Sequence, residues 1–133
     1  MSFMLDTNIC IYMIKTRPDT VIKHLVAKRP HEVGISSVTL AELRYGVEKS
    51  AKVEKNRLAL EMLTSSLQVL PFDSFAAERY GSIRAHLEKN GKLIGPMDLL
   101  IAAHASSMNW TLVTNNLKEF KRVPDLNLEN WAS

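Results

Sequence analysis

The chain begins with the apolar stretch Phe3-Met4-Leu5, followed by the polar turn Asp6-Thr7-Asn8 and a second apolar run from Ile9 to Ile14. This order predicts a buried strand, a turn and a helix. In an open α/β sheet, ligands bind outside the carboxyl ends of the strands, which makes Asp6 a candidate for the chemistry of this protein. Asp, Thr and Asn are also preferred N-caps, so capping of the following helix is the alternative role for the turn.

The composition predicts one globular domain spanning residues 1–133. Of the 133 residues, 46% are hydrophobic, and a chain of this length buries about two-thirds of its unfolded surface. No apolar stretch approaches the roughly 18 residues of a membrane span, and the first residues lack the features of a secretory signal. We therefore expect a cytoplasmic protein with no membrane contact. The single cysteine, Cys10, lies among apolar residues and is expected to be buried without a chemical role.

The chain is mildly basic, with a formal net charge of +3 and an isoelectric point near 9.1. This excess of positive charge is compatible with a polyanionic partner but is too small to identify one. Basic residues gather on several predicted helix faces, where such residues are most often solvated. One cluster follows the last predicted strand and is a candidate for contact with a polyanion if it borders a catalytic site. It consists of Lys118, Lys121 and Arg122.

Hydrophobic periodicity and turn residues predict four strands that alternate with helices. Strands are expected at residues 3–5, 33–36, 68–72 and 111–113. Helices are expected at about 8–15, 18–28, 37–49, 48–66 with a possible break near Ser50, 74–90, 96–105 and 117–121, before a terminal segment at 126–131. This alternation predicts a mostly parallel sheet with helices on both faces, in three layers.

Polar turns follow three of the predicted strands. They are Asp6-Thr7-Asn8, Ser36-Ser37 and Thr114-Asn115-Asn116. Because the carboxyl ends of parallel strands meet at one edge of the sheet, we expect these turns to face the same crevice. Ser37 is also expected to cap the helix that follows it.

Two further acids lie on helices that leave this edge. Asp98 is in the first turn of the apolar helix that starts at Pro96, where the helix dipole favours a carboxylate. Capping and function both remain open for Asp98, because an acid on a buried helix is costly unless a positive group meets it. Glu42 follows the second strand. A solvated position is its simplest interpretation, but Tyr45 and Gly46 on the same face favour close approach of a neighbouring segment.

If Asp6, Glu42 and Asp98 converge, the sequence predicts a metal site. Two carboxylates about 5 Å apart repel by roughly 3 kcal/mol at an effective dielectric of about 20, so three would require a cation at neutral pH. Oxygen-only ligands favour Mg²⁺ or Mn²⁺, and the sequence has no Cys/His set with zinc spacing. The histidines are scattered, and we expect His104 to be structural. Nucleophile motifs, phosphate-binding glycine loops and dinucleotide fingerprints are absent from the sequence.

Four stretches, in order and at similar spacing, resemble the PIN-domain ribonucleases, and more narrowly the VapC toxins of type II toxin–antitoxin (VapBC) pairs. Each stretch is weak evidence alone, whereas the four together are specific and cover essentially the whole chain. The stretches are Phe3 to Asn8, Ile35 to Leu43 with Tyr45-Gly46, Gly95 to Ala102, and Leu112 to Asn116 with Glu119-Phe120.

The resemblance implies a three-layer PIN-like fold whose acids bind Mg²⁺ or Mn²⁺ and hydrolyse RNA. The metal-binding acids of the family correspond to Asp6, Glu42 and Asp98. Many PIN proteins carry a fourth acid where this chain has Asn116, whereas the VapC pattern has that acid at Glu119, so a second metal site remains open. The polar residues expected to support the acids are Thr7, Asn8, Ser37, Thr114 and Asn116.

The same resemblance implies an endoribonuclease toxin that inhibits translation. Transfer RNA is the favoured substrate, and the most similar enteric proteins act on the anticodon region of initiator transfer RNA. The implied partners are a VapB-type antitoxin whose tail blocks the acids, a second copy of the chain in a homodimer, and the resulting toxin–antitoxin hetero-oligomer.

Two other classes of protein remain as alternatives. A phosphoacceptor receiver domain also gathers acids around Mg²⁺, but it needs an Asp at the end of a central strand and a lysine after a later one. This chain has Ser36-Ser37 and Thr114-Asn115 at the corresponding places. A silent RNA- or protein-binding module is the second alternative, and the intact acids argue against it.

Overall fold

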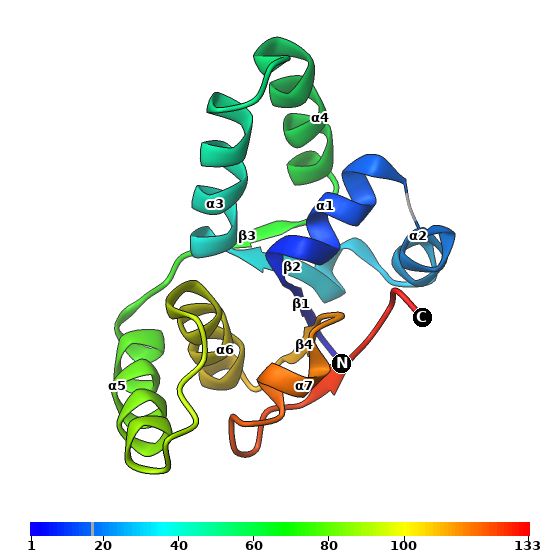
Figure 1. The fold of residues 1–133 in the computed structure, drawn as a ribbon. Coiled ribbons are helices and arrows are strands. Elements are labelled where there is room, and N and C mark those ends of the chain that lie inside the picture. The colour runs from blue at the N-terminus through cyan, green and yellow to red at the C-terminus, as the bar shows by residue number, and fades with distance from the viewer. Residues whose placement is uncertain (17) are drawn as a thin grey trace.

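A five-stranded parallel sheet forms the centre of the described part of the protein (Figure 1). The computed structural model describes residues 1–16 and 18–133. The strands lie in the order β3-β2-β1-β4-β5, and each neighbouring pair is parallel. Their bounds are Phe3–Leu5 (β1), Val33–Ser36 (β2), Gln68–Leu70 (β3), Thr111–Val113 (β4) and Leu128–Glu129 (β5).

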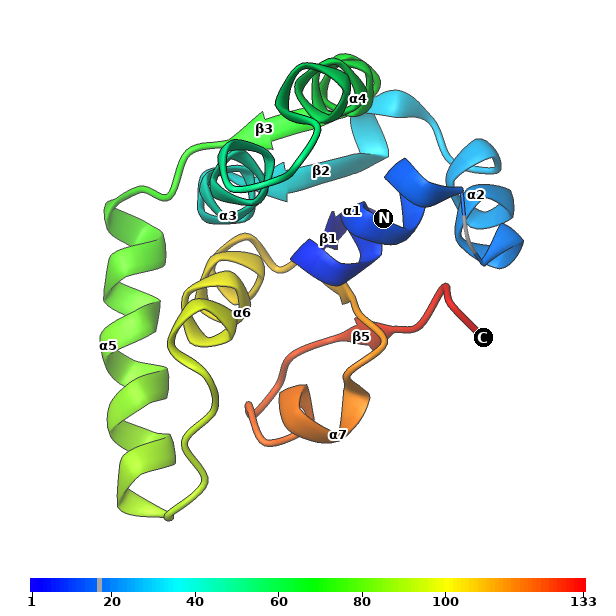
Figure 2. The same cartoon turned by 45° about the horizontal axis from the view of Figure 1, so that its top comes forward.

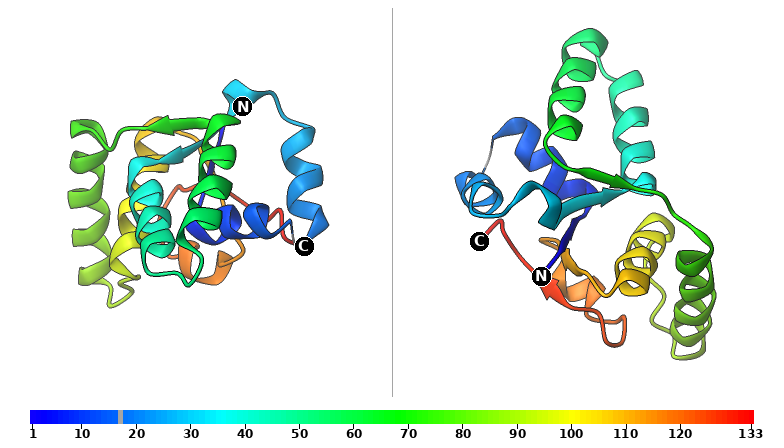
Figure 3. Two further views of the ribbon diagram at one scale, coloured as in Figure 1. Left: turned by 90° about the horizontal axis from the view of Figure 1, so that it is seen from above. Right: turned by 180° about the vertical axis from the view of Figure 1, so that it is seen from behind.

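Helices connect the strands and cover both faces of the sheet, which confirms the predicted fold class (Figure 3). None of the helices in the described residues has the length and apolar character needed to cross a bilayer. The helical segments are α1 (Thr7–Lys15), α2 (Asp19–Val26), a short 3₁₀ turn (Pro30–Glu32), α3 (Ser37–Glu48), α4 (Val53–Ser65), α5 (Ser74–Lys89), α6 (Pro96–Met108) and α7 (Leu117–Phe120).

The central strand β1 divides the core into two halves. Its side chains alternate between the two faces of the sheet, as a period of two requires. Phe3 and Leu5 belong to the apolar cluster formed with α1 to α4, whereas Met4 belongs to the cluster formed with α5, α6 and α7. All three side chains are at most 4% exposed. This two-sided burial explains why the strand contains no polar residue.

The strand order also determines where ligands can bind. From β1 the chain proceeds outward through β2 to β3, then returns to β4 on the other side of β1. The connections leaving β1 and β4 therefore diverge, which creates a crevice at their carboxyl ends. Asp6 follows β1 and Thr114 follows β4, so both residues lie at this switch point.

Several local predictions differ from the structure at element ends. The second helix begins at Asp19 and ends at Val26, and the third strand ends at Leu70. The break between α3 and α4 spans residues 49–52, and the terminal segment contains β5. Ser36, not Ser37, caps α3, because its hydroxyl accepts from the Val38 amide at 3.1 Å. Sequence pattern alone could not distinguish two adjacent serines that both suit this role.

The predicted close approach of a neighbouring segment at Tyr45 and Gly46 is wrong for the single chain. Tyr45 is 66% exposed. A Cβ atom added at Gly46 would meet no atom within 4 Å. Gly46 instead lines an open apolar pocket between α1, α3 and α4. Among the described residues, no neighbouring segment packs against Gly46, and the absent side chain leaves this pocket open.

Candidate active site

Asp6 lies at the centre of the crevice and is fixed from two sides. Its Oδ1 accepts from the Ile9 amide at 2.9 Å and so caps α1. The Thr114 hydroxyl also hydrogen-bonds to its side chain. Asp6 is only 3% exposed. Burial raises the pKa of Asp6, and nearby Glu42 adds to the rise, while the bonds from Thr114 and Ile9 oppose it. Asp6 itself is therefore the N-cap of α1, so the capping role that the sequence left open for this turn belongs to Asp6 and not to Thr7 or Asn8.

Glu42 is held beside the start of α1. Its Oε1 accepts from the Thr7 hydroxyl at 2.6 Å, across 35 residues of sequence. Glu42 is half-buried, and its charge contributes to the raised pKa of Asp6. The solvated interpretation of Glu42 is therefore wrong, because the second turn of α3 places this side chain against the crevice. Thr7 supports Glu42 directly, as its predicted role requires.

Asp98 and Glu119 form the other side of the crevice. Asp98 is in the first turn of α6, and Glu119 is on α7. Glu119 accepts from the Gly95 amide at 3.0 Å through Oε1 and from the Asn116 side chain at 2.7 Å through Oε2. These two bonds lower the pKa of Glu119, the Gly95 amide having the larger effect. Asn116 therefore orients the fourth acid.

The four carboxylates are close enough to influence one another. Burial raises the pKa of Asp98 to about 7, and the charges of Glu119, Asp6 and Glu42 contribute to the rise. When protonated, Asp98 hydrogen-bonds to Glu119. None of the four acids forms an ion pair within residues 1–16 and 18–133. The crevice therefore concentrates negative charge that protonation or a bound cation would offset.

The donor chemistry of this cluster suits a hard divalent cation, although the side chains are not yet arranged around one. All four groups offer carboxylate oxygens, the ligands that Mg²⁺ and Mn²⁺ prefer. Within the described residues, no three His, Cys, Asp or Glu side chains form a group that could hold a metal ion in their present positions. Binding would require the carboxylates to turn toward a common point.

The remaining predicted residues differ in how closely they approach the acids. Thr114 is fully buried, and its hydroxyl accepts from the Asn116 amide at 2.9 Å. Asn8 is exposed on the first turn of α1. Ser37 is at the same edge, but its hydroxyl accepts from the Phe72 amide at 3.0 Å and so secures the segment after β3. Three exposed basic residues lie on and just after α7, the helix that carries Glu119: Lys118, Lys121 and Arg122.

The sequence did not identify the backbone contribution of Gly95. A Cβ atom there would lie 3.6 Å from Asp98 Oδ2 and 3.7 Å from Glu119 Oε1. Its amide is the donor that fixes Glu119 beside Asp98. The Gly-Pro pair at the start of α6 indicates a helix start, but not that its amide faces an acid from α7. That contact depends on how α7 packs.

His104 is structural, as predicted. It is 1% exposed, and its Nδ1 lies 2.7 Å from the Ser36 hydroxyl. Burial lowers its pKa. The ring also packs edge-on against Phe72, with 5.5 Å between ring centroids. His104 thus joins α6 to the end of β2, and the acids need no histidine as an immediate partner.

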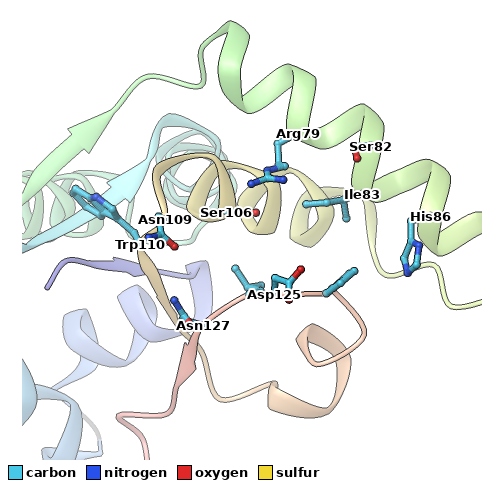
Figure 4. Close-up of a pocket in the computed structure, with 11 residues that line it drawn as sticks. Arg79, Ser82, Ile83, His86, Ser106, Asn109, Trp110, Asp125 and Asn127 are labelled. Carbon is cyan, nitrogen blue, oxygen red and sulfur yellow. The ribbon is translucent and has the colours of Figure 1, made fainter.

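A separate polar cavity of about 330 Å³ lies between α5, α6 and the loop before β5 (Figure 4). Trp110 and Asn127 line it and immediately precede β4 and β5, so it opens at the amino edge of the sheet. None of the four acids lines this cavity. We therefore assign the candidate chemistry to the carboxyl edge.

Metal-free Asp98→Asn protein is expected to unfold at higher denaturant concentration than the wild type at pH 8, but not at pH 4. Because the folded pKa of Asp98 is raised to about 7, the native state holds a proton that the unfolded state releases from about pH 4 upward. Stability therefore falls as pH rises from about 4 through 7. Solvent screening at this half-buried group reduces the effect to on the order of 1 kcal/mol.

Urea titrations at both pH values in the presence of EDTA measure this difference. Asp125→Asn is the matched control, because Asp125 is exposed and its positive φ of 60° also suits Asn. Equal stabilisation by both substitutions, or none by Asp98→Asn, would contradict the proposed charge repulsion.

Comparison with known proteins identifies the family. The sequence model of the PIN-domain family matches residues 3–126 of this chain. The chain belongs to the PIN-domain family. Within this family it is similar to the VapC ribonucleases. It is 49% identical to ribonuclease VapC2 of Rickettsia felis over 132 residues, covering 98% of each chain. It is 45% identical to the tRNA(fMet)-specific endonuclease VapC of Salmonella typhimurium over 132 residues, covering 99% of each.

Solved structures agree with this assignment. The crystal structure of DNA-bound VapBC from Salmonella typhimurium contains a chain that matches this PIN domain with a TM-score of 0.94 and 44% identity, covering 98% of each chain. At that similarity the two chains share the whole fold. The PIN-domain and VapC resemblance seen in the sequence is confirmed.

Proposed function

We propose that this PIN-domain protein is a metal-dependent endoribonuclease toxin that hydrolyses RNA phosphodiester bonds. The observation that carries the proposal is the gathering of Asp6, Glu42, Asp98 and Glu119 at the switch point, where burial, together with the charges of the other three acids, raises the pKa of Asp98 to about 7. Such a cluster is unfavourable without a cation, and a divalent cation beside a phosphodiester is suited to its hydrolysis.

Mg²⁺ or Mn²⁺ is the proposed cofactor, held by Asp6, Asp98 and Glu42, with Glu119 as the fourth acid. When bound, the ion lowers the pKa of a coordinated water and polarises a phosphoryl oxygen. Asp6 remains oriented by the Ile9 amide, and Glu42 by the Thr7 hydroxyl at 2.6 Å. In-line attack by water on phosphorus breaks the bond to the 3′ oxygen, leaving a 5′-phosphate and a 3′-hydroxyl.

The proposed substrate is transfer RNA, including the anticodon region of initiator transfer RNA. This assignment takes the substrate named for the Salmonella relative, and cleavage of it would inhibit translation. A cytoplasmic location follows from such a substrate. Three exposed basic side chains near Glu119 are proposed to hold the RNA backbone, because their positive charge attracts phosphate. They are Lys118, Lys121 and Arg122.

The proposed protein partners are a VapB-type antitoxin and a second copy of the chain. Similar chains occur in VapBC complexes from Rickettsia felis and Salmonella typhimurium. An antitoxin segment that covers the carboxylates would block both the metal and the RNA. We propose a homodimer that binds antitoxin to form a hetero-oligomer.

Cleavage of an initiator transfer RNA transcript by the purified protein is expected to stop in EDTA and to return when Mn²⁺ or Mg²⁺ is added. The acids cannot supply the electrophile themselves, so activity depends on the cation. Gel analysis of the RNA and mapping of the new 5′ ends measure the effect. His86→Ala, which removes an exposed histidine on α5, is expected to retain metal-dependent cleavage. Cleavage that persists in EDTA would overturn the proposal.

A further inference from the structure

An open groove of about 770 Å³ runs beside the crevice, between α1, the start of α2 and the C-terminal segment. Figure 2 shows the backbone arrangement of these segments. It is separate from the four acids, none of which lines it. Its lining combines an aromatic ring, amides and charged side chains. These are Tyr12, Lys15, Pro18, Asp19, Asn115, Asn130 and Ala132.

The groove is connected to the reacting edge through a chain of contacts. Thr114 hydrogen-bonds to Asp6, and Asn115 is the next residue in the same turn. The Asn115 side-chain amide donates to the Tyr12 hydroxyl at 2.7 Å. This bond joins α1 to the turn after β4 and orients the Tyr12 ring. The ring is half-buried, so it is held in place while part of its surface remains accessible.

Three side chains on α1 form a row, here called the track, that leads from the crevice into the groove. Asn8, Tyr12 and Lys15 are spaced i, i+4 and i+7, so they share one face of the helix. The track covers about 10 Å along the helix axis. It begins beside Asp6 and ends at Lys15, which is exposed and forms no ion pair in the part of the chain that the structure describes.

We infer that this groove binds a single-stranded nucleotide that flanks the cleaved bond, an inference that rests on the proposed ribonuclease function. The Tyr12 ring stacks on the base, and the Lys15 ammonium contacts a phosphate of the same strand. Aromatic rings bind bases of any sequence by stacking, whereas side-chain amides discriminate between base edges. The amides of Asn115 and Asn130 therefore select among bases at this position.

The charges along the groove favour one orientation of the nucleotide. Asp19 lines the same groove as Lys15. A carboxylate repels phosphate but accepts from the amino groups of bases. The phosphate therefore lies toward Lys15, and the base edge lies toward the amides and Asp19.

RNA binding by Asp6→Asn protein, which leaves the RNA uncut, tests this inference. The probe is a fluorescent transcript of initiator transfer RNA, followed by anisotropy in Mn²⁺. Adding Tyr12→Ala is expected to raise Kd about 5- to 100-fold, because one base loses its stacking partner. Tyr12→Phe keeps the ring and is expected to restore most of the binding. Lys15→Gln is expected to lower the slope of log affinity against log salt by about one.

Matched controls lie on α5, away from the groove. Phe75→Ala removes an aromatic ring that is 72% exposed, and Lys89→Gln removes an exposed charge. Both are expected to leave Kd unchanged. In the Asp6-containing enzyme, Tyr12→Ala is expected to raise KM more than it lowers kcat. Loss of the preferred cleavage position in Asn115→Ala would support base selection.

The possible failures are distinguishable. Absence of RNA cleavage by the wild type in Mn²⁺ overturns both the proposed function and this inference. Normal cleavage by the wild type, with Kd unchanged in both Tyr12→Ala and Lys15→Gln, overturns the groove alone. Lys15 is exposed, so its variant is informative even if Tyr12→Ala unfolds. If Tyr12→Ala and Lys15→Gln leave RNA binding unchanged but weaken inhibition by the antitoxin, the groove binds a protein and the inference is overturned.

Discussion

Asp6→Asn protein is expected to fold normally and to lose ribonuclease activity by about 10²- to 10³-fold. Asn keeps the side-chain oxygen that accepts from the Ile9 amide, so the cap of α1 remains. Burial already raises the pKa of Asp6, so a neutral side chain costs the fold little. The substitution therefore removes the negative charge that the cation needs while preserving the shape of the site. Initial rates of transfer RNA cleavage in Mn²⁺ measure the loss.

Asp73→Asn provides a closely matched control for this substitution. Asp73 caps α5 as Asp6 caps α1, its Oδ1 accepting from the Ala76 amide at 3.0 Å. It lies outside the group of four acids, so Asp73→Asn is expected to retain cleavage. Equal activity of Asp6→Asn and wild-type proteins would show that the crevice is not the site of hydrolysis.

Trp131→Ala is expected to lower the free energy of unfolding by about 3–5 kcal/mol. Trp131 is fully buried near the end of the chain and packs on two elements. Its ring stacks on His24 of α2, with 5.3 Å between centroids, and lies 5.5 Å from the Phe3 ring of β1. Its Nε1 donates to Glu129 Oε1 at 2.9 Å. Truncation removes the ring volume from all of these contacts together.

Urea unfolding monitored by circular dichroism measures this loss. Phe75→Ala is the control, because a ring that is 72% exposed contributes little to folding. Trp131→Phe is expected to recover part of the stability by refilling some of the volume. A loss below about 1 kcal/mol for Trp131→Ala would mean that the C-terminal segment does not pack on the sheet.

Hydrophobic pattern alone was enough to predict the layers of this fold. Phe3-Met4-Leu5 is apolar on both faces because the strand is covered by helices from both sides. The alternation with helices then required parallel strands and a common carboxyl edge. The short last strand, Leu128–Glu129, was not predicted, because two residues carry no detectable period and its pairing with β4 comes from tertiary packing.

The candidate site was predictable to a different extent for each acid. Asp6 could be placed because it directly follows a buried strand. Glu42 and Asp98 lie on helices, where a carboxylate is usually a solvated residue or a cap, and the resemblance to the PIN family was needed to select them. The partners that orient the acids, such as Gly95 for Glu119, were not predicted because they come from elements that only packing brings together.

The sequence by itself therefore determined the class of fold, the edge of the sheet where chemistry is possible, and the family. These depend on local periodicity and on ordered motifs, which are properties of neighbouring residues. Tertiary structure alone decided that Asp6 itself caps α1, that the Thr7 hydroxyl donates a hydrogen bond to Glu42, and that the Asn115 amide donates one to the Tyr12 hydroxyl beside the crevice. Two of these contacts span 35 and 103 residues, so they exist only after the crossovers of the sheet have brought distant turns to one edge.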